Sequence, residues 1–230
     1  MAVQRVAFYG GSFDPPHLGH LAVARAARDL LALDRILFAP VGAQPLKPIG
    51  ATVSFDDRVA MTRLAVAEEP SFQVSLIDAP LPDGHGGWRA NYTIDALSRL
   101  RSELPRNSEL FQFMGADSFR SLRLWQQAAE IPFAAQLIVA SRPGEQLDDL
   151  AALLPDGIVH SVPVDLLAGA VRRFTLSDRS GRTVPFFLLL GLHVEISATA
   201  IRSEWETARK LLPAAVADYI QARGLYGATA

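Results

Sequence analysis

The sequence GGSFDPPHLGH, residues 10–20, lies between two segments with different hydrophobic patterns. The apolar run at residues 6–9 predicts a strand, and apolar residues repeat at helical spacing over residues 18–33. A strand, a tight glycine loop and a helix start therefore follow one another. Glycines at such a junction let a ligand approach the backbone closely, and the helix start offers N–H groups and a positive dipole end to an anion.

Two histidines, His17 and His20, lie three positions apart at this helix start. Both imidazoles can lie over the same turn, because residues three apart share a helix face. Histidine donors beside glycine N–H groups suit phosphate chemistry. An ordinary strand-to-helix turn with a capping histidine has the same ingredients, and each residue taken alone fits that simpler interpretation. It is the whole string that favours a phosphate site.

Composition limits the remaining possibilities. With 230 residues, half of them apolar, we expect one domain over residues 1–230 with a sizeable core. A net charge of −2 gives no general attraction to nucleic acid or to an anionic membrane, so we expect neither as a partner. The absence of cysteine excludes disulfides and thiolate metal sites and fits a cytoplasmic location. Without a signal-like start, and with its longest apolar run only at residues 184–192, the chain is expected to be soluble.

Strand and helix patterns alternate along most of the chain. Strands are predicted at residues 3–9, 35–41, 72–77, 110–114 and 136–140, and helices at residues 18–33, 54–69, 92–104 and 213–223. Loops are predicted at residues 41–53 and 81–91, and a hairpin at residues 173–190 that turns at 178–181. This order predicts an α/β fold with a doubly wound parallel sheet, in which ligands bind beyond the carboxyl ends of the strands.

A second candidate motif, ISATAIR at residues 196–202, follows a strand and opens a predicted helix. Ser197 can cap that helix, and the hydroxyls of Ser197 and Thr199 can also donate to phosphate oxygens. Arg202 lies one turn further along and could reach the same anion. Taken alone, the segment is explained more simply as a capped amphipathic helix with a solvent-facing arginine.

Together the two motifs resemble the signatures of the nucleotidylyltransferase superfamily, and the resemblance is closest to the bacterial nicotinate-nucleotide adenylyltransferases. Further matches are NYTIDAL at 91–97, FMGADS at 113–118 with Trp125 downstream, RPG at 142–144 and the tail over 212–226. The resemblance covers nearly the whole chain. It implies a Rossmann-like fold with a small C-terminal helical part, residues 196–230. It also implies transfer of an adenylyl group from ATP to nicotinate mononucleotide, giving deamido-NAD and pyrophosphate in NAD biosynthesis.

The resemblance implies a role for each matching position. The catalytic residues that it implies at the triphosphate are His17, His20, Lys47 and Arg202. The ATP-binding residues that it implies are Gly10, Gly11, Ser12, Phe13, Gly115, Asp117, Ile196, Ser197 and Thr199. The substrate-binding residues are Tyr92, Thr93 and Trp125; Thr93 would receive the nicotinate carboxylate and Trp125 would stack on the pyridine ring. A plain N-cap for Thr93 and an ordinary core position for Trp125 are the alternatives.

The implied reaction needs no covalent nucleophile, because the mononucleotide phosphate attacks the α-phosphorus of ATP in line. Cations and helix starts would position two anions and stabilise the developing charge. The expected cofactor is Mg²⁺, carried by the ATP phosphates and waters, and we expect no metal ligands from the protein.

The chain departs from the family pattern in two places. Pro45-Leu46-Lys47 stands where the family has Pro-His-Lys or Pro-His-Arg, so the cation is kept and the imidazole is missing. The segment between Arg202 and Leu212 is also shorter than in the family. The alternatives are an adenylyltransferase that uses nicotinamide mononucleotide or phosphopantetheine, a cytidylyltransferase, and a nucleotide-binding regulator without catalysis. A homo-oligomer is compatible with the sequence.

Overall fold

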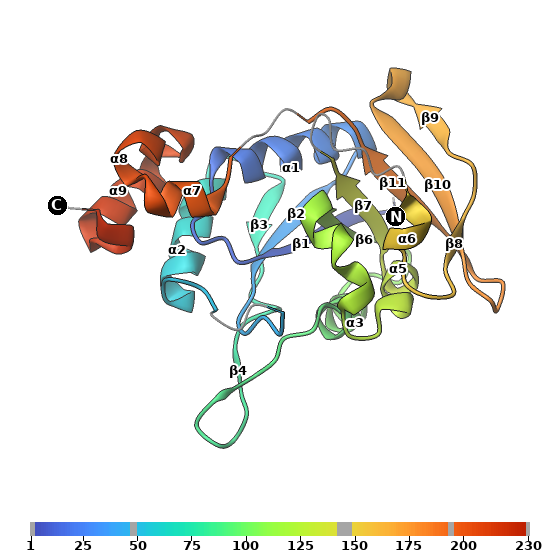
Figure 1. Cartoon of the computed structure of the whole chain (residues 1–230), viewed down its shortest axis with the longest axis horizontal. Coiled ribbons are helices and arrows are strands. Elements are labelled where there is room, and N and C mark those ends of the chain that lie inside the picture. The colour runs from blue at the N-terminus through green and yellow to red at the C-terminus, as the bar shows by residue number, and fades with distance from the viewer. Residues whose placement is uncertain (1–2, 47–49, 142–148, 193–195, 229–230) are drawn as a thin grey trace. The chain divides into compact units, whose positions relative to one another are not determined.

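The computed structural model describes residues 3–46, 50–141, 149–192 and 196–228, which form two compact units. Unit 1 contains Met1–Tyr9, Ala26–Ile36 and Tyr92–His193. Unit 2 contains Gly10–Arg25, Leu37–Asn91 and Val194–Ala230. Three elements run from one unit into the other: β1 (Arg5–Gly11), α1 (Leu18–Leu31) and β2 (Arg35–Pro40) (Figure 1).

A mostly parallel sheet forms the centre of unit 1, with the strand order β1-β6-β7-β11-β10-β8 and with β9 also paired to β10. The added strands are β6 (Glu109–Gly115), β7 (Gln136–Ala140), β8 (Val159–His160), β9 (Val164–Leu166), β10 (Val171–Ser177) and β11 (Thr183–Leu189). The β1/β6, β6/β7 and β7/β11 pairs are parallel, whereas β8, β9 and β11 run antiparallel to β10. The predicted α/β class is confirmed, and the sheet has an antiparallel part that follows from the predicted hairpin.

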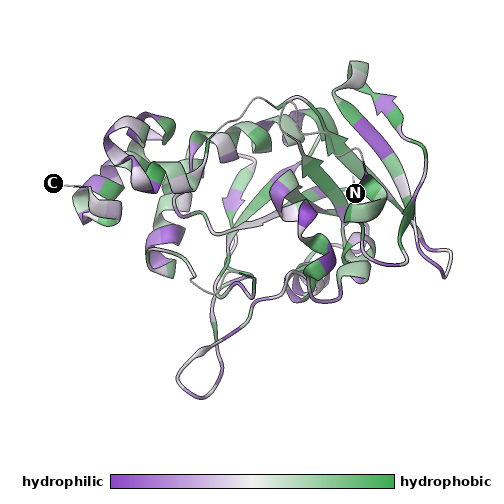
Figure 2. Ribbon diagram, viewed as in Figure 1, coloured by the Kyte–Doolittle hydropathy of each residue, from purple (hydrophilic) through white to green (hydrophobic). Residues whose placement is uncertain are grey.

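The central strands of unit 1 are continuous apolar runs because both of their faces are buried. Leu137, Ile138 and Val139 of β7 have no exposed surface. The register places Tyr9 of β1 opposite Phe113 of β6, and their ring centroids are 4.5 Å apart. Figure 2 shows β6, β7 and β11 as predominantly hydrophobic. The helices of unit 1 are α3 (Thr93–Glu103), α4 (Ala116–Arg120), α5 (Ile131–Ala134), α6 (Leu150–Leu153), and the 3₁₀ turns η1 (Leu122–Leu124), η2 (Ala128–Glu130) and η3 (Leu167–Gly169).

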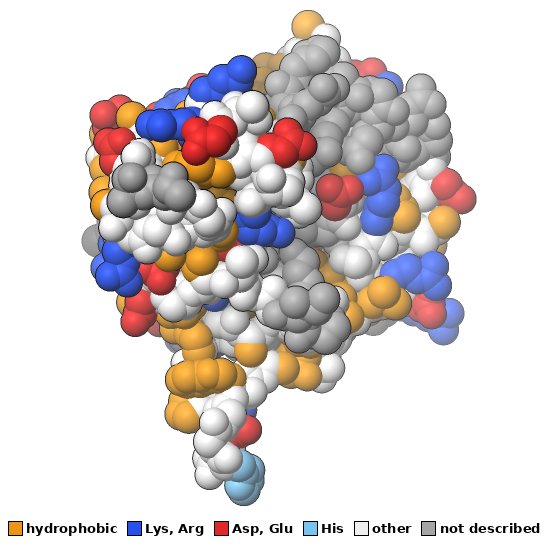
Figure 3. Space-filling view, turned by 60° about the vertical axis from the view of Figure 1, so that its left-hand side comes forward, with side chains coloured by type: hydrophobic (Ala, Val, Ile, Leu, Met, Phe, Trp, Pro, Cys, Tyr) orange, Lys and Arg blue, Asp and Glu red, His pale blue; other side chains and the backbone are white. Residues whose placement is uncertain are grey.

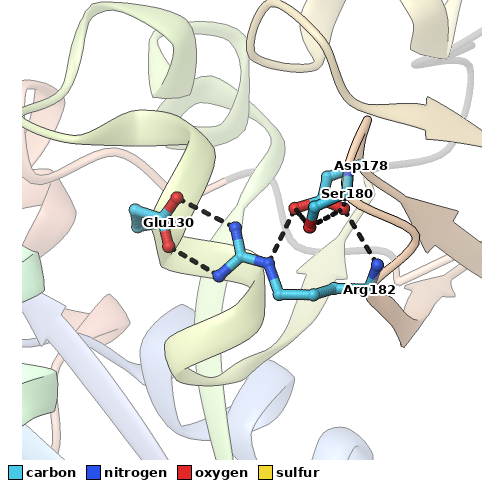
Figure 4. Close-up of polar contacts among 4 residues, drawn as sticks. All are labelled: Glu130, Asp178, Ser180 and Arg182. Carbon is cyan, nitrogen blue, oxygen red and sulfur yellow. Dashed lines mark hydrogen bonds and ion pairs between the residues drawn. The ribbon is translucent and has the colours of Figure 1, made fainter.

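The predicted hairpin is confirmed as β10 and β11, and a carboxylate closes its turn. Asp178 accepts hydrogen bonds from the backbone N–H groups of Ser180 and Arg182, each at 2.9 Å, and from Arg182 Nε at 2.7 Å (Figure 4). Loss of solvent raises the pKa of Asp178, but the hydrogen bonds from Arg182 and Ser180 outweigh it and lower the pKa to about 2. Arg182 also binds both carboxylate oxygens of Glu130 and lies over the ring of Phe133, so it connects the turn to η2 and α5.

Unit 2 contains most of β2, with β3 beside it, and a group of helices. Its elements are α2 (Phe55–Val66), β3 (Phe72–Val74), β4 (Leu81–Pro82), β5 (Trp88–Arg89), α7 (Ala198–Ser203), α8 (Trp205–Ala208), η4 (Arg209–Leu211), α9 (Ala214–Arg223) and η5 (Leu225–Gly227). Helices α7, α8 and α9 lie beside α2 in Figure 1. Met61 of α2 packs there with Ile201, Trp205, Val216 and Ile220, none of which is more than 7% exposed. The chain beyond residue 196 is helical, as predicted.

Local sequence signals place the ends of several helices correctly. Ser54 caps α2, where its Oγ accepts from the N–H of Asp57 at 3.0 Å. Pro213 precedes α9, and Gly224 ends it with a φ of 60° in the left-handed region, where glycine has no Cβ to clash. Strand β3 stops at Val74, earlier than predicted, and α2 ends at Val66.

The segment at residues 81–91 was predicted as a loop, and this is wrong in part because β4 and β5 form a short antiparallel hairpin there. Leu81 is opposite Arg89, and Pro82 is opposite Trp88. The carboxylate of Asp83 accepts from two backbone N–H groups of the turn. Figure 3 shows this hairpin extending from the rest of unit 2, with hydrophobic side chains along its base. Two residues per strand are too few to give a recognisable alternation.

Among the described residues, no helix combines the length and the hydrophobicity that a membrane crossing requires.

Candidate active site

Residues 10–17, called here the glycine loop, are held at three points within unit 2. The prediction that both glycines lie in a loop after the strand is wrong, because β1 continues through Gly11. The carbonyl of Gly11 accepts from the N–H of Val41 at 2.9 Å. The carbonyl of Ser12 accepts from Nη1 of Arg58 at 2.8 Å, and Ser12 Oγ donates to Gln44 Oε1 at 3.0 Å. The loop is therefore fixed by neighbours that come from the segment after β2 and from α2.

Phe13 anchors the same loop through its ring. The side chain is 2% exposed and packs against Phe38 and against the edge of His20, with centroid separations of 5.6 and 5.1 Å. Its φ of 47° lies in the left-handed region, which is uncommon for a bulky residue. A Cβ on Gly11 would lie 3.3 Å from this ring, which favours glycine there. The ring of Phe13 is therefore a core contact that holds the loop.

The two histidines lie together, as their spacing predicts. Their rings stack with centroids 3.7 Å apart and an interplanar angle of 29°. The backbone N–H of His17 donates to Nδ1 of His20 at 3.2 Å. A neutral His20 therefore carries its proton on Nε2. Burial, and then the neighbouring His17, lower the pKa of His20 well below its ordinary value. At neutral pH His20 is an uncharged hydrogen-bond donor.

The ISATAIR segment meets the glycine loop within unit 2, although 188 residues separate the two contacting positions. Nη1 of Arg202 donates to the carbonyl of Asp14 at 2.7 Å, and Nη2 donates to Thr199 Oγ1 at 3.2 Å. Ser197 occupies the N-cap position of α7, but its side chain makes no capping hydrogen bond, and both hydroxyl-bearing residues are exposed. Ile196 packs on the C-terminal helical cluster, so its side chain belongs to the core.

Three residues that the sequence did not single out as site residues lie in the glycine loop or contact it. Asp14 and Arg58 are 5% and 2% exposed, and the Tyr226 hydroxyl donates to the Asp14 carboxylate at 2.7 Å. Burial lowers the pKa of Arg58, and the carboxylate of Asp14 opposes that shift. Asp14 lies within the motif and Tyr226 within the matching tail, but only the folded structure reveals that they are joined.

A cavity of about 590 Å³ opens beside this region in unit 2. Its lining includes Gly42, Ser54, Phe55, Arg58 and Trp88. The volume falls within the range of about 300–1,000 Å³ that is typical of small-molecule sites. The two segments predicted as loops, residues 41–53 and 81–91, therefore share a cavity wall.

The nicotinate-binding candidates belong to unit 1. Tyr92 is the N-cap of α3 and makes no side-chain capping bond, while the half-buried Thr93 is the first helical residue. The alternative that Thr93 is the N-cap is therefore wrong. Trp125 is also half-buried, and its Nε1 donates to Ser121 Oγ at 3.1 Å. Part of its ring reaches the surface, unlike that of an ordinary core residue.

Gly115 and Asp117 lie where β6 passes into α4, also in unit 1. Gly115 is the N-cap of α4, with φ −80° and ψ 164°, and a Cβ built on it would meet no atom within 4 Å. Asp117 is exposed and pairs with Arg120 at 3.2 Å. The backbone at Gly115 is therefore open to the approach of another molecule.

Lys47 and the RPG match at 142–144 lie outside the described residues. Within the described part of the chain, no group of three or more histidine, aspartate or glutamate side chains is arranged to hold a metal ion.

Comparisons with known proteins identify the family of the chain. The model of the cytidylyltransferase-like family matches residues 8–204. A probable nicotinate-nucleotide adenylyltransferase of Pelobacter propionicus is 36% identical over 230 residues, covering 96% of this chain and 98% of the relative. Another, of Gloeobacter violaceus, is 35% identical and covers 97% of this chain and 96% of the relative.

Solved structures share the fold. The Plasmodium falciparum nicotinic acid mononucleotide adenylyltransferase complexed with NaAD has a TM-score of 0.67 at 17% identity, covering 98% of both chains. A putative nicotinate-nucleotide adenylyltransferase of Vibrio parahaemolyticus has a TM-score of 0.59 at 14% identity, covering 99% of this chain and 98% of its own. From the family match and the full-length relatives, we conclude that the chain belongs to the nicotinate-nucleotide adenylyltransferase family, within the cytidylyltransferase-like proteins.

Proposed function

We propose that this protein transfers the adenylyl group of ATP to nicotinate mononucleotide, forming deamido-NAD and releasing pyrophosphate. The observation that carries the proposal is that Arg202 donates to the carbonyl of Asp14, three residues before the stacked pair His17 and His20. It is supported by relatives named nicotinate-nucleotide adenylyltransferases over nearly the full length, and by Plasmodium falciparum structures complexed with NaAD and with APC.

For this reaction the protein must hold two anions, the phosphate of the mononucleotide and the triphosphate of ATP, in position. A phosphate oxygen of the mononucleotide forms a bond to the α-phosphorus of ATP, and the bond from that phosphorus to the bridging oxygen of the β-phosphate breaks. Pyrophosphate leaves with the electron pair. Preorganised donors aimed at the developing charge on its oxygens supply the catalysis, and no covalent intermediate is required.

Donors for the triphosphate come from both motifs of unit 2. His20 offers Nε2–H as a neutral donor, and His17 stacks beside it. Arg202 offers a positive charge whose position is fixed by its bonds to Asp14 and Thr199. We assign Lys47 to the same role from its place in the family pattern. The remaining ATP contacts are assigned to the backbone of Gly10, Gly11, Ser12, Phe13 and Ile196 and to the exposed hydroxyls of Ser197 and Thr199.

The nicotinate carboxylate is assigned to the start of α3. The first N–H groups of an α-helix have no partner within the helix, and the positive dipole end favours an anion. Because the Tyr92 side chain makes no capping bond, the N–H groups of the first two residues of α3 and the Thr93 hydroxyl can serve the carboxylate. Trp125 is assigned to stack on the pyridine ring, and Gly115 and Asp117 to the ribose.

ATP is proposed to enter as its magnesium complex, with the ion held by phosphate oxygens and waters, as Mg²⁺ prefers. We also propose a cytoplasmic location, which the absence of cysteine fits. We propose no nucleic-acid or membrane partner, because the net charge of −2 supplies no general electrostatic attraction to either.

Isotope labelling tests the direction of transfer. Purified protein with Mg²⁺, nicotinate mononucleotide and ATP labelled at the α-phosphorus should place the label in deamido-NAD, whereas label at the γ-phosphorus should appear in pyrophosphate. His20→Ala should lower the rate by about 10²-fold, as for the loss of one charge-stabilising donor. ATP binding without labelled dinucleotide would favour a nucleotide-binding regulator and contradict the proposal.

A further inference from the structure

Asp14 joins three distant segments of unit 2 to the glycine loop. Its Oδ1 accepts from the Tyr226 hydroxyl at 2.7 Å, and its Oδ2 accepts from the N–H of Thr52 at 2.6 Å. Its carbonyl accepts from Arg202 at 2.7 Å. The side chain of Asp14 is thus engaged by the protein itself, and its contacts hold the loop between the glycines and His17.

Tyr226 reaches Asp14 from a strained position in η5. Its φ is 54°, in the left-handed region, between Gly224 at 60° and Gly227 at 76°. A non-glycine residue keeps such a conformation only where its surroundings fix it. Burial, and then the hydrogen bond to Asp14, raise the pKa of Tyr226, so its hydroxyl stays protonated as a donor.

Loss of the hydrogen bond from Tyr226 to Asp14 would move the groups around Asp14. A hydrogen bond to a carboxylate is shorter and stronger than one between neutral groups, and a buried carboxylate that loses a donor seeks another. The carboxylate of Asp14 acts electrostatically on Arg58, which already donates to the carbonyl of Ser12. A shift of Asp14 would therefore disturb both Ser12 and Arg202, which lie on the two motifs.

We propose that Tyr226 is a positioning residue for ATP: through its bond to Asp14 it holds the glycine loop and Arg202 in the arrangement that receives the triphosphate. The inference rests on the proposed function, because that function is what assigns the loop and Arg202 to ATP. It also gives the C-terminal tail a role in ATP binding. The hydroxyl acts on binding, so its loss raises the KM for ATP more than it lowers kcat.

The test compares two tyrosines that each donate to a buried carboxylate. Tyr226→Phe removes the hydroxyl and keeps the ring and the backbone strain. Tyr219→Phe is the matched control, because the Tyr219 hydroxyl donates to Asp57 at 2.9 Å from the neighbouring α9. The affinity for α,β-methylene-ATP is measured by calorimetry, KM and kcat by steady-state kinetics, and the melting temperature of each variant in parallel.

We expect Tyr226→Phe to weaken the binding of the analogue and to raise the KM for ATP, each by about tenfold, equivalent to about 1.4 kcal/mol. Its kcat should stay within about threefold, and the KM for the mononucleotide should not change. Tyr219→Phe should lower the melting temperature and leave the analogue affinity unchanged. Asp14→Ala should also weaken the binding of the analogue. Adding Tyr226→Phe to it should weaken binding little further, because Asp14→Ala has already removed the acceptor of the Tyr226 hydrogen bond.

Unchanged analogue affinity in Tyr226→Phe would overturn the inference. Equal weakening by Tyr219→Phe, or a Tyr226→Phe protein that is unfolded at the assay temperature, would overturn it in favour of a purely structural role. Failure of the proposed function looks different. A wild-type protein that binds the analogue but forms no deamido-NAD would overturn the reaction and leave the Tyr226 comparison valid, whereas one that binds no analogue would overturn both.

Discussion

At the scale of single residues, the site depends on groups whose protonation or size is set by contact with a neighbour. His20 is the clearest case, since its Nδ1 accepts from the backbone of His17 and its pKa is lowered. A charged His20 imidazole would lose that acceptor, because Nδ1 would then carry a proton. The proposed triphosphate donor at this position is therefore a neutral imidazole and not a cation.

This lowered pKa predicts a loss of stability in mild acid. Below the ordinary histidine pKa of about 6.5 the unfolded chain takes up a proton that folded His20 resists, so the free energy of unfolding should fall as the pH drops. The slope from this residue is at most about 1.4 kcal/mol per pH unit. Urea unfolding between pH 7.5 and 5 should show a shallower decline for His20→Gln. The same pH dependence of the free energy of unfolding in the wild type and in His20→Gln would contradict a neutral His20.

The substitution Gly115→Ala should affect nucleotide binding without affecting the stability of the fold. Its backbone angles suit any residue, and a Cβ would meet no protein atom within 4 Å, so Gly115→Ala should leave the melting temperature unchanged. If the nucleotide packs on this residue, the methyl group should weaken nucleotide binding by about tenfold, or about 1.4 kcal/mol. Calorimetry with an ATP analogue measures this change in affinity.

Gly42→Ala is the contrasting control. Its Cβ would lie 2.6 Å from backbone atoms of Pro80, so it should destabilise the fold by about 1–3 kcal/mol, the usual cost of overpacking. Nucleotide affinity that is unaffected by Gly115→Ala would remove Gly115 from the ATP site.

At the scale of elements, one carboxylate ties the cap of α2 to α9. Asp57 accepts from Ser54 Oγ at 2.6 Å, from the Tyr219 hydroxyl at 2.9 Å and from Arg223 at 3.3 Å. The hydrogen bond from Ser54, joined by those from Tyr219 and Arg223, lowers the pKa of Asp57 although burial raises it. The stabilisation is present above the ordinary aspartate pKa of about 3.9 and is lost as the pH falls through the lowered value.

Removing this carboxylate should therefore loosen the helical part of unit 2. Asp57→Ala leaves three donors without their acceptor, and we expect it to reduce the free energy of unfolding by about 2–3 kcal/mol at pH 7. Asp56→Ala is the control, since Asp56 is exposed in the same first turn and contributes about 0.3–1 kcal/mol through the helix dipole. Chemical denaturation of both variants compares them. Equal reductions in the free energy of unfolding would show that Asp57 stabilises α2 only as a negative charge in its first turn.

Elements that end at local signals are predictable from the sequence. The Ser54 cap, the Pro213 start, the Gly224 stop and the turn at Asp178 all depend on residues within four positions. The hairpin of β4 and β5 is not predictable in this way, because two residues per strand leave no periodic pattern.

At the scale of the whole molecule, the α/β class follows from the alternation of strands and helices, and the two motifs identify the family. The contacts that assemble the site do not follow. Arg202 meets the carbonyl of Asp14 across 188 residues, and Tyr226 meets its carboxylate across 212. A periodic pattern shows which face of an element is buried and does not show its partner, so such pairs emerge only from the fold.

The central claim is adenylyl transfer to an acid-bearing mononucleotide, and an acceptor panel tests it most directly. The measurement is kcat/KM with ATP and Mg²⁺ for nicotinate mononucleotide, nicotinamide mononucleotide and phosphopantetheine. A carboxylate only accepts hydrogen bonds, so the N–H groups and the Thr93 hydroxyl at the start of α3 should favour it. The NH₂ of an amide would place a donor against these donors and weaken binding by about 1–3 kcal/mol. We predict that nicotinate mononucleotide exceeds its amide by at least about tenfold, and that phosphopantetheine is inactive. Equal values for acid and amide would contradict the carboxylate site at α3, and greatest activity on phosphopantetheine would contradict the central claim.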